Sequence, residues 1–230
     1  MTASNFVQPI LRRKQRNLDI QDLQGLLTIH WEINQFTLFS RFYTRIDQVF
    51  LIWGFICALL FFTAQFVAIS WTVQLIVATV LTIAGSLGTV WLTWYWAMVE
   101  RLKWVVYLWV VLMLLGIGLT NWGLFGGWWQ LLMYLCPLWL GLCGIGYLGT
   151  AWGLRSRAFT VSGIVHLLGI VSLPYMLQWQ YLVTGLISAG TLFLLAETQW
   201  DMQSTSSYQT LTKEQRQFNQ RQEYLRQSAS

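Results

Sequence analysis

The sequence predicts an all-α integral membrane protein with six transmembrane helices, and two observations lead to that fold class. Of the 230 residues, 56% are hydrophobic and only 10% are charged, whereas a soluble domain is typically about 25% charged. Between Arg45 and Glu100, Asp47 alone carries a formal charge. Because about 20 apolar residues cross a bilayer, that segment predicts two spans joined by a tight turn.

Similar apolar segments follow, and together they predict a six-span domain over residues 46–198. The expected spans are Ile46–Phe66, Gln74–Met98, Leu102–Thr120, Trp128–Thr150, Ala158–Met176 and Gln180–Glu197. Each is long enough to cross the hydrocarbon core as a helix. Pro137 falls inside the fourth span, where its ring and missing N–H are expected to kink the helix.

Charged residues occur in every second linker, and this alternation predicts the orientation of the chain. The cytosolic topology anchors are expected at Arg45, Arg101, Lys103, Arg155 and Arg157. The other linkers are uncharged and rich in aromatic residues, so all fourteen Lys and Arg and all nine Asp and Glu fall on one side. By the positive-inside rule, both termini are expected in the cytoplasm, with the spans in a bacterial inner membrane or an organelle or thylakoid-type membrane.

An internal repeat of about 56 residues is expected within the six spans. When the chain is shifted by that length, Arg45 aligns with Arg101 and Trp53 aligns with Trp109. The spans then form three helical hairpins in parallel orientation, each entered after a cytosolic arginine. Parallel internal repeats occur in transporters, which favours a transport function slightly.

Small residues recur in the second, fourth and sixth spans and predict which helices pack most closely. In lipid, helix association depends on close van der Waals contact between small residues. The expected helix-packing residues are Gly85, Gly88, Gly141, Gly144, Gly185 and Ala189. These three spans are accordingly expected to be the inner helices of the bundle.

His166 is an ionisable side chain expected deep in the bilayer, which makes it a candidate functional residue because burying it is costly. Three interpretations stay open. It is a neutral histidine hydrogen-bonded to a neighbouring span, or the cofactor-binding ligand of a haem or chlorophyll-like group, or a residue that handles protons or contacts a substrate. A haem held by two histidines would need a second one, and His30 lies outside the spans.

The polar leader, residues 1–45, contains a basic cluster at residues 12–16, followed by a segment with two overlapping patterns. Leu23, Leu27 and Trp31 have helical spacing, whereas the alternation of apolar and polar residues from Ile29 to Ile33 is typical of a strand. We predict a helix over residues 19–39 that lies on the membrane surface with its apolar face down. The alternative is a short ordered arm packed on the bundle.

The C-terminal tail, residues 199–230, is also polar. Residues 198–209 have the composition of a linker, and residues 212–227 predict a short helix whose Gln215 is placed for a capping box. Such a helix is either solvated or disordered, or it docks on a partner.

Several function classes are excluded by missing motifs. There is no HExxH or GxSxG motif and no carboxylate in mid-membrane, as intramembrane proteolysis would need. The scattered acidic residues form no cluster for a divalent metal. Cys57, Cys136 and Cys143 form no CxxC pair. The basic residues form no stripe of the kind that binds nucleic acid.

We therefore expect no enzyme and no metal site, but an accessory, assembly or stabilising factor that packs in the lipid bilayer beside a larger membrane-protein complex. The first alternative is a channel or carrier for a small uncharged or lipophilic solute, favoured by the repeat. The second alternative is a haem- or chlorophyll-binding subunit of a respiratory or photosynthetic complex, with His166 as the ligand.

Overall fold

The computed structural model of the chain describes residues 9–15, 17–33, 36–202 and 211–228. Six helices in this part are long and apolar enough to span a membrane, which confirms the predicted class of helical membrane protein. The six helices are α2 (Arg45–Phe66), α3 (Trp71–Val99), α4 (Lys103–Phe125), α6 (Leu135–Leu154), α7 (Arg157–Ser172) and α8 (Gln180–Glu197). Two short 3-10 helices, η2 (Leu173–Tyr175) and η3 (Leu177–Trp179), connect α7 to α8.

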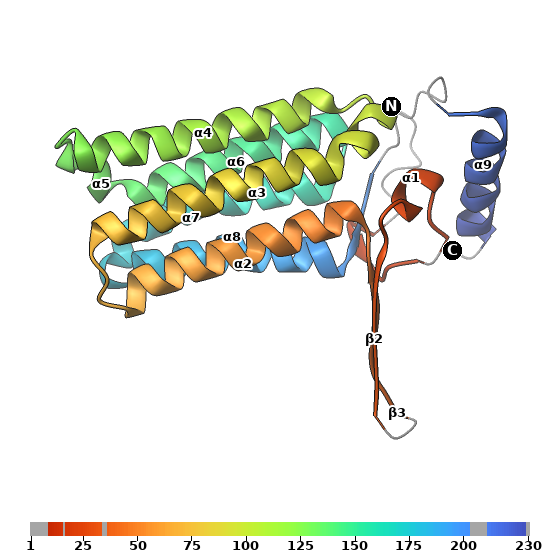
Figure 1. Ribbon diagram of the computed structural model, residues 1–230, viewed down its shortest axis with the longest axis horizontal. Coiled ribbons are helices and arrows are strands. Elements are labelled where there is room, and N and C mark those ends of the chain that lie inside the picture. The colour runs from red at the N-terminus through yellow and green to blue at the C-terminus, as the bar shows by residue number, and fades with distance from the viewer. Residues whose placement is uncertain (1–8, 16, 34–35, 203–210, 229–230) are drawn as a thin grey trace.

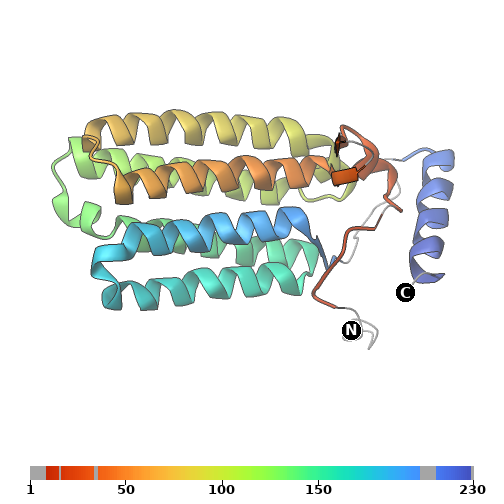
Figure 2. The same cartoon turned by 90° about the horizontal axis from the view of Figure 1, so that it is seen from below.

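The six long helices run side by side as one bundle (Figures 1 and 2). Each packs against the next one along the chain, and α8 packs back along α2. The closest packing joins α2 to α8 and α6 to α7. In each pair the two helices belong to different predicted hairpins. Because α3 packs mainly against α2 and α4, the prediction that α3, α6 and α8 are the inner helices is wrong. Small residues on α2 and α7 also allow close packing, so contacts are shared around the bundle.

The fourth predicted span is divided into α5 (Trp129–Met133) and α6, which are separated at Tyr134. Pro137 therefore lies in the first turn of α6, where its missing N–H removes no helical hydrogen bond. In a continuous helix the proline ring would collide with the carbonyl of Met133, four residues earlier. The expected kink is thus a complete break.

In its described residues the leader contains one single-turn helix, α1 (Ile20–Leu23), followed by two strands, β2 (Leu27–Ile33) and β3 (Phe36–Tyr43). The strands pair antiparallel as a hairpin that projects sideways from one end of the bundle (Figure 1). The helix predicted over residues 19–39 is therefore wrong. β-Branched and aromatic residues at alternate positions favour a pleated strand, and Gly25, with φ +71°, separates the hairpin from α1.

The two tails fold together at the end of the bundle from which the hairpin projects. Strand β1 (Leu11–Arg12) pairs with β4 (Gln199–Trp200), and α9 (Lys213–Ser228) lies against α1 (Figure 1). We call β1, α1, β4 and α9 the cap. Arg16 of the predicted basic cluster and residues 203–209 of the predicted linker lie outside the described residues.

The capping box predicted for the C-terminal helix is confirmed. The backbone N–H of Thr212 donates to Gln215 Oε1 at 3.0 Å, and the backbone N–H of Gln215 donates to Thr212 Oγ1 at 3.3 Å. These bonds satisfy two donors that a helix start leaves unpaired. The helix α9 is docked on α1, in contrast to a freely solvated tail.

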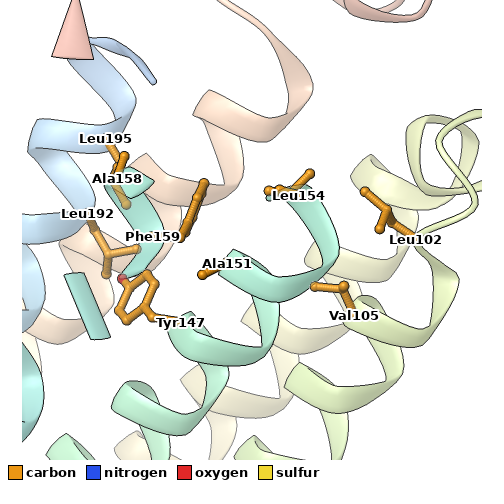
Figure 3. Close-up of a cluster of buried hydrophobic side chains, with 9 residues drawn as sticks. All are labelled: Leu102, Val105, Tyr147, Ala151, Leu154, Ala158, Phe159, Leu192 and Leu195. Carbon is orange, nitrogen blue, oxygen red and sulfur yellow. The ribbon is translucent and has the colours of Figure 1, made fainter. Parts of the chain in front are cut away.

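A cluster of buried apolar side chains lies near the cap end of the bundle (Figure 3). It is contributed by the start of α4, the second half of α6, the start of α7 and the end of α8. Its members are Leu102, Val105, Tyr147, Ala151, Leu154, Ala158, Phe159, Leu192 and Leu195. The cluster brings four helices together directly beneath the cap.

Candidate functional site

The bundle contains a partly open, apolar cavity of about 560 Å³ that is lined by residues of all six long helices. The lining runs along α3 from Trp71, near its start, to Ala97, near its end. At 1.5 Å per residue this stretch measures about 40 Å. The volume is therefore spread along most of the bundle as a long, narrow space. At the cap end its walls include Leu102, Leu154 and Phe159 of the buried cluster.

Polar groups on the cavity wall are hydrogen-bonded in a recurring arrangement. Between α2 and α3, the indole N–H of Trp53 donates to Thr89 Oγ1 at 2.8 Å, and Thr89 Oγ1 donates to the carbonyl oxygen of Gly85 at 2.8 Å. Both side chains line the cavity. The bonds leave the wall without a free donor at this point, as an apolar environment requires.

The same arrangement occurs between α4 and α6. The indole N–H of Trp109 donates to Thr150 Oγ1 at 2.9 Å, and Thr150 Oγ1 donates to the carbonyl oxygen of Gly146 at 2.8 Å. The two tryptophans are 56 residues apart, but the two threonines are 61 apart, and α5 has the length of this difference, 5 residues. An alignment with a gap would pair Gly85 with Gly146 in place of Gly141. The repeat itself stays a prediction.

His166 lies on α7, is 0% exposed, and is among the residues that line the cavity. Its Nδ1 lies 2.8 Å from the carbonyl oxygen of Ser162 on the same helix. Because a carbonyl only accepts, Nδ1 carries the proton and Nε2 is an acceptor. Within the described part of the chain, Nε2 has no hydrogen-bond partner. The geometry thus joins His166 to its own helix and leaves Nε2 buried without a hydrogen-bond partner among the described residues.

Tyr147 packs against His166 on the cavity wall, and Trp109 packs in turn against Tyr147. The ring of Tyr147 lies 4.8 Å from the imidazole ring, between centroids, and packs edge-on against Trp109 at 5.3 Å. Trp109, Tyr147 and His166 are therefore parts of one surface of the cavity wall. The sequence pointed to Trp109 through the repeat and to His166 as an ionisable residue within a span, but it gave no sign that both contact Tyr147.

Most of the predicted helix-packing residues lie against a neighbouring helix. Gly85 and Gly185 lie against side chains of α2, Gly141 and Gly144 lie against side chains of α7, and Ala189 is buried. At Gly88, in contrast, an added Cβ would meet nothing within 4 Å, so the role predicted for Gly88 is wrong. Other packing glycines were missed, among them Gly54 on α2, Gly116 on α4, Gly146 on α6 and Gly163 on α7.

The five predicted topology anchors all lie at the cap end. Arg45 begins α2, Arg101 and Lys103 lie at the turn between α3 and α4, and Arg155 and Arg157 lie at the turn between α6 and α7. Arg101 and Arg155 adopt positive φ angles of 59° and 50°, where the chain leaves a helix and reverses. Lys103 Nζ lies 5.1 Å from the ring centroid of Trp94.

Buried polar side chains join the cap to the bundle. Asn219 of α9 accepts from the backbone N–H of Ile20 at 2.9 Å and donates to Gln21 Oε1 at 3.0 Å. Gln21 in turn donates to Glu100 Oε1 at 3.0 Å. Glu100 is only 1% exposed. The sequence carried no signal for this chain of contacts, because its members are far apart along the chain.

The stability of the cap is expected to depend on pH through Asp22. Burial, followed by the nearby carboxylates of Asp19 and Glu100, raises the pKa of Asp22 from 3.8 to about 7. The folded cap therefore binds a proton more tightly than the unfolded chain, and this stabilisation is lost as pH rises from about 4 through about 7. Amide hydrogen exchange of α1 and α9, corrected for its intrinsic rate, should increase over that range by up to about tenfold per pH unit.

The matched variant for this prediction is Asp22→Asn, which keeps the shape of the side chain and cannot ionise. Its exchange rates should lose the extra pH dependence. Equal pH dependence in Asp22→Asn and the natural protein would contradict the assignment to Asp22.

In the described ranges, no three His, Cys, Asp or Glu side chains gather as a possible metal site. No model of a known protein family, no curated protein and no solved structure matches the chain. The cavity is therefore the feature of the molecule from which a function is inferred.

Proposed function

We propose that the protein is a membrane-embedded binding protein and carrier for a chain-like apolar molecule that occupies the cavity of the bundle. The observation that carries this proposal is a space of about 560 Å³ lined by all six long helices. A long, narrow space fits an acyl or isoprenoid chain better than a flat disc such as a haem. The sequence-based alternative of a lipophilic-solute carrier thus becomes the leading proposal, ahead of the accessory role.

Recognition in such a site depends on shape and on a few polar atoms. A ligand that enters from the bilayer leaves surroundings that are as apolar as the cavity, so the hydrophobic effect contributes little. Affinity then comes from van der Waals contact along the chain. Nε2 of His166 is buried and has no partner among the described residues, and we propose that a small side-chain movement on binding brings it into contact with the ligand. We therefore propose a ligand with a hydroxyl or N–H group, such as a long-chain alcohol.

We propose that the cap end faces the cytoplasm. The support is the positive-inside rule, applied to the topology anchors at that end. In this orientation the cap lies at the cytosolic mouth of the cavity, and the aromatic turns lie at the opposite membrane surface.

Filling the cavity is expected to block binding. Ser86 lines the cavity, and its buried Oγ has no hydrogen-bond partner among the described residues, so Ser86→Phe removes space without breaking a polar contact. The matched control is Leu87→Phe on the next residue, which is 67% exposed and outside the lining. A long-chain alcohol that carries a diazirine would be photolysed in proteoliposomes, and the labelled residues identified by peptide mass spectrometry.

The natural protein and Leu87→Phe should be labelled on cavity residues such as Met113 and Leu192. The Ser86→Phe variant should lose that labelling severalfold while keeping the labelling of lipid-facing residues. Equal labelling of the cavity in both variants, or labelling confined to lipid-facing residues, would contradict the proposal.

The same preparation distinguishes the other candidate functions. A stoichiometric membrane-protein partner beside an unlabelled cavity would favour the accessory or assembly factor. An absorption band that is lost in His166→Ala would favour haem or chlorophyll binding. The observation that supports this candidate is the contact from His166 Nδ1 to the Ser162 carbonyl, since metal-binding histidines commonly donate their other N–H in this way.

A further inference from the structure

The β2–β3 hairpin leaves the bundle at the level where the first span begins. Thr44 and Arg45 connect β3 directly to α2, and the hairpin projects sideways, across the direction of the helices and beyond their outline (Figure 1). Since the six helices run through the bilayer, a hairpin in this direction runs along the membrane surface.

The pairing of the two strands gives the hairpin one mainly apolar face and one mainly polar face. Leu27 pairs with Tyr43, Ile29 with Arg41 and Trp31 with Phe39. Directly paired residues share one face of an antiparallel hairpin, and the positions between them belong to the other face. One face thus contains Leu27 and Ile29 of β2 with Arg41 and Tyr43 of β3, and the other contains Thr28, His30 and Glu32, with Phe42 beside Thr28 at the base of the hairpin.

Contacts at the base of the hairpin show which face is turned toward the bundle. Tyr43 Oη donates to Glu197 Oε1 at 2.6 Å, and Arg41 Nε lies 3.9 Å from Glu197 Oε2. Glu197 is the last residue of α8, so the Tyr43 face looks toward the end of the helices. On the opposite face, His30 Nε2 lies 3.5 Å from Glu32 Oε2, and both side chains are 51% exposed.

We propose that the hairpin lies flat on the bilayer in which the bundle is embedded, with lipid covering the face that contains Leu27, Ile29 and Arg41. Leu27 is 46% exposed, and contact with acyl chains removes that apolar surface from water. Arg41 extends its guanidinium to lipid phosphates, while its aliphatic stem stays on the apolar side. The His30–Glu32 face remains in water.

Two physical limits fix the depth of the hairpin. Each strand of a two-stranded sheet has an unpaired edge, and those backbone N–H and C=O groups cannot enter the hydrocarbon core without partners. An isolated hairpin is also marginally stable in water. The headgroup region satisfies both limits, because it supplies water to the edges and apolar contact to one face.

Neighbouring residues on opposite faces provide the test. Ile29→Cys and His30→Cys would each be made in a chain whose native cysteines are replaced with alanine, and labelled with bimane. Fluorescence would be measured in nanodiscs of phosphatidylcholine with natural or brominated acyl chains, and with iodide in the water. Reference positions are Leu87→Cys, on the exposed surface of α3, and Glu214→Cys, on the exposed start of α9.

Bromine should quench the label at position 29 severalfold more than the label at position 30, and iodide should show the opposite order. Equal iodide quenching at both positions without bromine quenching would place the hairpin in water and overturn the proposal. Protection of position 29 from both quenchers would show a protein contact there and would also overturn it. Each variant is first checked for a monodisperse profile, and a failing position 29 is replaced by Leu27→Cys on the same face.

Discussion

Asp201→Ala is expected to lower the free energy of unfolding by about 3 kcal/mol, because one carboxylate holds the start of α7 to the cap. Asp201 accepts from Arg157 Nε at 2.8 Å and from the backbone N–H groups of Arg157 and Ala158 at 3.1 and 3.0 Å. It also accepts from Ser156 Oγ at 3.0 Å. A residue beyond the last span thereby caps the fifth, and removing it leaves several donors unpaired.

The pKa of Asp201 gives this prediction a pH signature. Burial alone would raise its pKa, but the hydrogen bonds from Arg157, Ala158 and Ser156 outweigh burial and lower the pKa below 3.8. A lowered folded-state pKa means that the stabilisation is present above about pH 4 and is lost as pH falls through the folded-state pKa. The difference between the natural protein and Asp201→Ala should therefore shrink in acid.

Denaturant titration in detergent, followed by tryptophan fluorescence, measures both effects. Asp201→Asn should lose less stability than Asp201→Ala, since its amide oxygen still accepts from a backbone N–H. The control is Glu214→Ala, which removes an exposed carboxylate from α9. If Asp201→Ala and Glu214→Ala were equally stable, the capping role would be wrong.

Gly185→Ala should destabilise the closely packed pair α2 and α8, whereas Gly88→Ala should not destabilise the protein. A Cβ at position 185 would lie 2.8 Å from the Cβ of Phe61. That atom is fixed to the backbone of α2, so the helices must move apart, at an expected cost of about 1–3 kcal/mol. At Gly88 the new methyl group meets nothing within 4 Å, and the better helix propensity of alanine can add up to about 1 kcal/mol.

The pair is a matched test because both changes add the same methyl group within a membrane-spanning helix. Unfolding would be followed in mixed detergent micelles at increasing mole fraction of dodecyl sulfate. Equal midpoints for the two variants would contradict the packing assigned to Gly185.

Local patterns in the sequence predicted most of the helical fold and little of the cavity. The apolar runs predict the spans because the bilayer imposes one length and one polarity on every helix that crosses it. The alternating charges predict that all five topology anchors share one end. The repeated Trp53 and Trp109 fall on the cavity wall, but only the packed helices show that each donates to a threonine of the next helix.

The leader shows where local pattern is insufficient. Leu23, Leu27 and Trp31 favoured a helix, and the alternation from Ile29 to Ile33 favoured a strand. Pairing with β3 decided for the strand, since each residue gains a cross-strand partner there. The local pattern of one segment does not show whether it forms a helix or one strand of a hairpin. The hydrogen bonds of the hairpin depend on the second strand, which is another segment of the chain.

By itself, then, the sequence determined the class of protein, the six spans and the end of the bundle at which its charges gather. Those properties follow from the composition of short segments, because the bilayer imposes a length and a polarity on each helix that crosses it. Tertiary structure alone decided that Glu100 is buried beneath Gln21, that Asp201 caps α7, and that His166 shares a cavity with Trp109. Each of these contacts joins residues at least 43 positions apart, or different helices, so it exists only once the bundle has packed.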